Sequence, residues 1–114
     1  MEADKGASGV TALSQERKED LRQQAKSLRN EHQSIVRFSD FLACYKHQAK
    51  QLVSSLTKIF DEESQKLRGT DLAEKRLLYF YVANETMFKT KDSSLTYIKA
   101  FGDQLHNWIE IFTK

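Results

Sequence analysis

The chain has 114 residues, which is enough for one domain with a single hydrophobic core but not for two. Its formal net charge of +2 is too small to indicate a nucleic-acid binder, and its single cysteine, Cys44, excludes an internal disulfide. Proline is absent and glycine occurs only four times, whereas a fold with many tight turns needs more of both. The composition therefore predicts an all-α protein.

The N-terminal part begins with small and polar residues that include two glycines, so we expect a flexible lead over 1–13 and a helical domain over 14–114. Ser14 is a suitable N-cap for a first helix that ends near Arg29. The apolar face of this helix is thin and its charges have mixed signs. An amphipathic helix that binds membranes is therefore disfavoured.

Two amphipathic helices are predicted next. Apolar residues recur at spacings of three and four over 34–45, and the same spacing returns over 49–60. We expect a tight turn between them, near 45–47. The acidic and polar run 61–68 then ends the third helix.

The stretch 75–91, KRLLYFYVANETMFKTK, has a middle part, 77–83, that is apolar on every side, so we expect it to be buried all round. Periodicity alone does not distinguish a buried strand from a buried helix. The apolar character extends past strand length, however, and residues 69–74 carry a glycine followed by capping-box spacing. We therefore predict a central helix over about 71–90 that its neighbours wrap.

After a polar loop at 92–94, a last helix is predicted to begin at Leu95, with apolar residues recurring at 95, 98, 101, 105, 109 and 112. This stripe is still strongly apolar at the end of the sequence. We expect either that further helices belong to this domain or that a partner covers the edge. The partner could be a second copy of this chain, which would then self-associate through the last helix.

The sequence offers little for catalysis or metal binding. Cys44 and His47 have ligand-like spacing, but two ligands do not make a zinc site. Glu62 and Glu63 are adjacent, so on a helix they point in different directions and do not form a catalytic pair. No Gly-rich phosphate loop or nucleophile motif occurs. We expect a binding protein without catalytic residues, metal or cofactor.

Polar residues in the second half of the central helix are candidates for binding. Tyr81 shares a helical face with Asn84 and Glu85, and such a set can hydrogen-bond the backbone of an extended peptide. Packing of Tyr81 in the core is an equally good interpretation. Lys89 and Lys91 could bind a phosphate, although the residues alone favour compensation of the helix dipole.

The same stretch, 75–91, resembles the signature helix of the CTD-interacting domain (CID) family, whose members carry a pattern close to KKL..LYLANDVIQNSK and bind the C-terminal repeats of RNA polymerase II. The identical positions are Lys75, Leu77, Tyr81, Ala83, Asn84 and Lys91. The similarity extends over about 34–105. It implies a right-handed superhelical bundle of about five to eight helices, related in shape to VHS and ENTH adaptor domains.

The resemblance also implies a groove beside the central helix that holds a Tyr-Ser-Pro heptad peptide in a β-turn. The implied site residues are, for the peptide, Tyr81, Asn84, Glu85 and Phe88 and, for a phosphate, Lys89 and Lys91. Glu85 stands where the family has Asp, while Phe88 and Lys89 stand where it has Gln and Asn. The family's last two helices have no counterpart in this sequence, so the chain resembles a divergent or C-terminally shortened member.

The implied function is a non-catalytic nuclear module in transcription termination or RNA 3′-end processing. Its implied partners are the phosphorylated heptad repeats of RNA polymerase II and other termination or processing proteins, without membrane binding or direct nucleic-acid binding. The alternative is a helical scaffold for protein assembly that has no working groove. Trp108, Ile109 and Phe112, at the C-terminal edge, favour that alternative.

Overall fold

The computed structural model describes residues 12–113, and within them it contains helices and turns but no strand. The helices are α1 (Gln15–Lys26), α2 (His32–Cys44), a short 3₁₀ helix η1 (Lys46–Gln48), α3 (Ala49–Lys66), α4 (Gly69–Thr90) and α5 (Thr96–Thr113). The prediction of an all-α bundle is confirmed, with five α-helices at the lower end of the expected range. None of these helices is both long and apolar enough to cross a bilayer.

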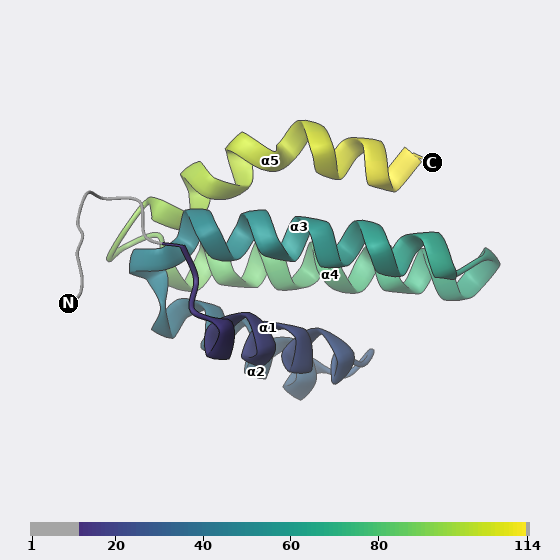
Figure 1. Ribbon diagram of the computed structural model, residues 1–114, viewed down its shortest axis with the longest axis horizontal. Helices are drawn as coiled ribbons and strands as arrows, with labels where there is room; N and C mark the ends of the chain where they lie inside the picture. Colours follow the sequence, from purple (N-terminus) through teal and green to yellow (C-terminus); the bar gives the residue numbers. More distant parts are fainter. Residues whose placement is uncertain (1–11, 114) are drawn as a thin grey trace.

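The helices stack in three layers (Figure 1). The long helices α3 and α4 run antiparallel and form the middle layer, with α5 on one side of it and α1 and α2 on the other. The most extensive contacts join α3 to α5 and α2 to α4. Most of the predicted lead, 1–13, lies outside the described residues, but its last residue, Leu13, is buried in the core.

Three helix boundaries follow local signals in the sequence. Ser14 caps α1 as predicted, because its Oγ accepts a hydrogen bond from the Arg17 backbone N–H at 3.0 Å. The tight turn expected near 45–47 is present as η1. Before α5, Ser94 Oγ accepts a hydrogen bond from the Thr96 N–H at 3.2 Å, so the predicted polar loop supplies a capping group.

The start of α4 differs from the prediction. The helix begins at Gly69, whose φ of 61° lies in the left-handed region that glycine adopts readily, and its N-cap residue is Arg68, which makes no side-chain capping bond. The Glu74 carboxylate, predicted for a capping box, instead accepts a hydrogen bond from Asn30 Nδ2 at 3.3 Å. Glu74 therefore links α4 to the loop between α1 and α2.

The core is centred where α3, α4 and α5 meet. The Phe60 ring lies 4.5 Å from the Tyr79 ring and 4.9 Å from the Trp108 ring, measured between centroids. The Trp108 indole Nε1 donates a hydrogen bond to Thr57 Oγ1 at 2.7 Å, and Thr57 in turn donates to the Val53 carbonyl at 2.7 Å. Trp108, expected at an uncovered C-terminal edge, is thus buried and satisfied.

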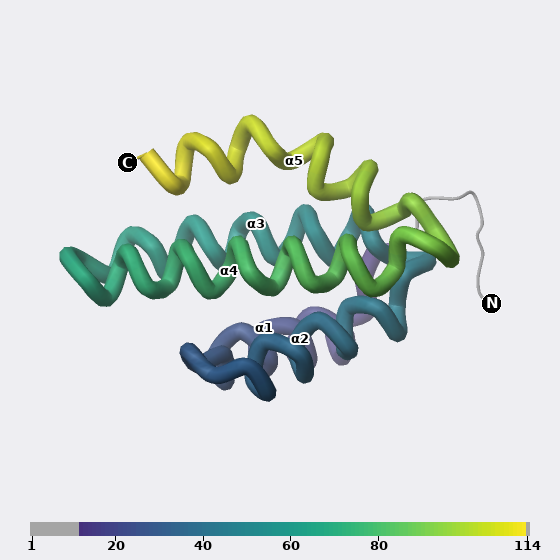
Figure 2. The backbone as a smooth tube through the Cα atoms, turned by 180° about the vertical axis from the view of Figure 1, so that it is seen from behind, coloured from purple at the N-terminus to yellow at the C-terminus, as the bar shows by residue number. Residues whose placement is uncertain are grey.

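The prediction that the middle of α4 is buried all round is wrong. Its inward side consists of four buried residues, Leu78, Tyr79, Val82 and Ala83. Leu77, Phe80 and Tyr81 are, in contrast, 48%, 52% and 42% exposed. The reason is geometric, because α2, α3 and α5 cover only part of the circumference of α4. Figure 2 shows the remaining side of α4 facing the viewer, between α5 and α2.

The bond between Trp108 and Thr57 gives a test of the core. We expect Thr57→Val to lower the free energy of unfolding by about 1–3 kcal/mol, because it leaves the buried indole N–H without an acceptor. Urea unfolding followed by circular dichroism measures the difference. Thr86→Val is the matched control, since Thr86 is also buried and donates to a carbonyl four residues back, that of Val82, at 2.7 Å. An equal loss in both variants would contradict the role of the indole bond.

Candidate functional site

One side of α4 is exposed along its whole length. Its residues recur at the three- and four-residue spacing of a helical face, and we call this surface the open face of α4: Leu77, Phe80, Tyr81, Asn84, Phe88 and Lys91. The structure thereby places Tyr81 at the surface rather than in the core, with Asn84 exposed beside it. Phe88 is 65% exposed. An apolar and aromatic surface with an amide in its middle is suited to contact a protein segment.

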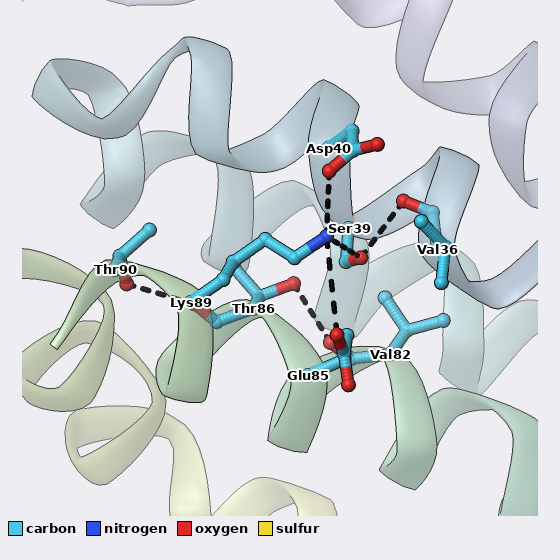
Figure 3. Close-up of polar contacts among 8 residues, drawn as sticks. All are labelled: Val36, Ser39, Asp40, Val82, Glu85, Thr86, Lys89 and Thr90. Carbon is cyan, nitrogen blue, oxygen red and sulfur yellow. Dashed lines mark hydrogen bonds and ion pairs between the residues drawn. The ribbon is translucent and has the colours of Figure 1, made fainter.

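The edge of this face towards α2 is occupied by an ionic cluster (Figure 3). Lys89 Nζ donates hydrogen bonds to Asp40 Oδ1 at 2.6 Å and to Ser39 Oγ at 2.8 Å, and it lies 4.0 Å from Glu85 Oε2. The Lys89 side chain is only 21% exposed, whereas that of Asp40 is 62% exposed. Lys89 therefore points towards α2, and two carboxylates already balance its charge.

Lys91 is in a different situation from Lys89, although both were predicted to bind phosphate. Its Nζ lies 5.3 Å from the centroid of the Phe88 ring and 3.5 Å from Asp92 Oδ1. The Asp92 side chain is 92% exposed, so this ion pair is weak and well hydrated. Lys91 also occupies the C-cap position of α4, where a positive charge interacts favourably with the helix dipole. It is a cation that remains accessible at the end of the open face.

Two buried threonines, Thr86 and Thr90, lie on the side of α4 opposite to the open face. Thr86 and Thr90 are buried, and their hydroxyls donate to the carbonyls of Val82 and Thr86 at 2.7 and 2.8 Å. Each polar group is therefore satisfied within the helix, and the methyl groups remain for packing. This arrangement leaves Asn84 and Phe88 directed outward and Glu85 and Lys89 at the edge.

The structure adds two residues that the sequence did not reveal. Ser39 is buried on α2, and its hydroxyl donates to the Val36 carbonyl at 2.9 Å while it accepts from Lys89. Asp40 follows it. Because these residues lie 50 and 49 positions before Lys89, no local pattern connects them with it.

Two observations concern the metal-ligating side chains and the buried tyrosines among the described residues. Residues 12–113 contain no cluster of three or more His, Cys, Asp or Glu side chains that could hold a metal ion. Burial, followed by the nearby Glu63 carboxylate, raises the pKa of Tyr79 far above its usual value. Burial also raises the pKa of Tyr97, whose hydroxyl donates to the Leu42 carbonyl. Both tyrosines stay neutral and serve packing.

The ion pair between Lys89 and Asp40 can be tested by a double-mutant cycle with Lys89→Met and Asp40→Asn. We expect a coupling energy of about 0.5–1 kcal/mol in urea unfolding, because Lys89 is largely buried while Asp40 is exposed. High salt should reduce the coupling. The control cycle, Lys91→Met with Asp92→Asn, joins two exposed residues and should show almost none. Equal coupling in the two cycles would contradict the bridging role of Lys89.

The chain was compared with known protein families, curated proteins and solved structures. The family described as CID domain matches residues 19–113, which is most of the chain and includes all five α-helices in whole or in part. No curated protein and no solved structure matches the chain. CID domains are protein-interaction modules rather than catalytic domains, in agreement with the exposed aromatic surface on α4. The chain belongs to the CID domain family.

Proposed function

We propose that the open face of α4, together with its edge towards α2, binds the phosphorylated C-terminal heptad repeats of RNA polymerase II. The module would act in the nucleus, in transcription termination or RNA 3′-end processing. The observation that carries this proposal is the exposure of Tyr81 and Asn84 on the helix that resembles the family's signature, with Lys91 at its end. Membership of the CID family supports a protein partner.

In this proposal the peptide is held mainly through its backbone. The Asn84 amide can donate to and accept from a peptide in a turn, while the rings of Tyr81 and Phe88 supply apolar contacts. Such a small contact surface corresponds to micromolar affinity, or about 8 kcal/mol of binding free energy. The exposed stripe suits a peptide segment better than a small molecule, which needs an enclosed pocket.

The Glu85 carboxylate is proposed to accept hydrogen bonds from the peptide turn. Its side chain is one methylene longer than that of the Asp found in the family, and flexibility would weaken this contact. Lys89 lies 4.0 Å from the carboxylate and is itself held by Asp40, so it restrains the longer side chain. We therefore assign Lys89 to the positioning of Glu85, and Lys91 to direct contact with a phosphate.

The phosphate contact predicts a selective effect of Lys91→Ala. We expect it to weaken binding of phosphorylated two-heptad peptides about five- to tenfold, because one charge-assisted contact is lost, and to leave the unphosphorylated peptide almost unchanged. Fluorescence anisotropy with labelled peptides measures both affinities. Lys26→Ala is the matched control, since Lys26 is also an exposed lysine at a helix C-terminus, in the last turn of α1. Equal losses for the two peptides would remove the phosphate role of Lys91.

The peptide contact predicts that Tyr81→Ala weakens phosphorylated and unphosphorylated peptides alike, by about tenfold or more, because both lose the aromatic contact. Tyr81 is 42% exposed, so circular dichroism should show a fold that is unchanged. Absence of saturable binding by the wild-type chain up to about millimolar concentration would overturn the proposed function. Binding that does not depend on Tyr81 would place the peptide elsewhere on the molecule.

A further inference from the structure

The outer side of α5 carries a second exposed apolar surface. Four large apolar residues there are between 41% and 57% exposed, namely Leu95, which directly precedes the helix, and Ile98, Leu105 and Ile109 within it. Together with Gly102 and the partly buried Phe112, they occur at alternating spacings of three and four residues. We call these six residues the outer stripe of α5. Their spacing is that of the a and d positions of a coiled-coil seam.

The outer stripe adjoins the open face of α4. The ring of Phe112 lies 6.2 Å from the ring of Phe80, measured between centroids. The two apolar surfaces are therefore in contact at these two rings. Figure 2 shows that α5 starts next to the end of α4 and diverges from it towards the C-terminus. Single-chain proteins rarely expose contiguous apolar patches of this kind unless the patch binds something.

Gly102 stands near the middle of the stripe and has no evident role within one copy of the chain. It is not among the glycines with positive φ, and a Cβ added there would meet nothing within 4 Å. A glycine inside a helix destabilises it relative to alanine. A glycine at position 102 would be explained if a bulky side chain of another molecule packs against the helix backbone there.

We propose that the outer stripe binds the same stripe of a second copy of this chain, with the two α5 helices antiparallel. A two-fold axis between residues 103 and 104 places Gly102 of one copy opposite Leu105 of the other. The same register brings Ile98 opposite Ile109, and Leu95 opposite Phe112, in both directions. The stripe is thus complementary to itself, as a two-fold symmetric interface requires, and the missing side chain of Gly102 leaves room for a leucine.

The charges beside the stripe agree with this arrangement. Lys99 and Glu110 are both exposed and lie on the solvent side of the stripe. In the antiparallel register, Lys99 of each copy lies close to Glu110 of the other, so two equivalent ion pairs flank the seam. In a parallel pairing Lys99 of one copy and Glu110 of the other would lie eleven residues apart along the seam, about 16 Å, so no such ion pair could form. The charges therefore favour the antiparallel orientation.

Sedimentation velocity of the whole chain tests the proposal over a concentration range up to about 1 mM. We expect a reversible dimer, and Leu105→Glu should raise its dissociation constant at least about tenfold, since a charge would be buried at the centre. Gln33→Glu is the control for added charge, because Gln33 is exposed on α2 in the opposite layer, and it should have no effect. A wild-type chain that stays monomeric overturns the proposal, as does a Leu105→Glu variant that dimerises normally.

Charge reversal tests the orientation of the two helices. Lys99→Glu and Glu110→Lys should each weaken the dimer several-fold, because each places like charges together, and the double variant should regain most of the loss. Failure of the double variant to recover would overturn the antiparallel register.

Gly102→Ala tests the close contact by two opposite effects. At low concentration, where the chain is monomeric, it should raise the melting temperature, because alanine favours the helix. At high concentration it should increase the dissociation constant of the dimer, because the added methyl group occupies the space for Leu105. Unchanged or tighter association of this variant would contradict the proposed contact.

Discussion

The aromatic contact among Phe60, Tyr79 and Trp108 joins the three long helices, and the other surfaces of the molecule depend on it. It draws α5 across α3 and towards one edge of α4, while α2 packs along another. The hydrogen bond from the Trp108 indole to Thr57 allows a large polar aromatic group to be buried at this junction without an unsatisfied donor. Five helices packed in this way cannot enclose α4 on all sides, and its open face is the result.

The circumference of α4 is divided among three environments. The buried side packs against its neighbours, the edge towards α2 carries the cluster of Lys89 with Asp40 and Glu85, and the remaining side is open. Because of this cluster Lys89 and Lys91, two residues apart and chemically identical, have different surroundings. Lys89 is directed into an interface between helices, whereas Lys91 stands at the end of the helix with only a hydrated partner.

The proposed peptide site and the proposed dimer use neighbouring but different surfaces. The peptide contacts centre on Tyr81 and Asn84 and extend towards α2, while the outer stripe of α5 adjoins the open face where the ring of Phe112 meets that of Phe80. A two-fold dimer would present two peptide sites, and two linked sites bind a repetitive peptide more tightly than one because the second contact is intramolecular. Each proposal nevertheless stands on its own observations, since affinity for a peptide and association state are measured separately.

The sequence by itself determined the helices, the Ser14 cap, the turn at η1 and the family, because these depend on local spacing and on a continuous motif in α4. Only the tertiary structure decided which sides of α4 and α5 are covered. An apolar run shows that burial is favourable but not how many neighbours are present to provide it, so 77–83 was wrongly predicted to be buried all round. The ion pair of Lys89 with Asp40 could not be predicted from the sequence either, because the two residues are 49 positions apart and come together only when α2 packs on α4.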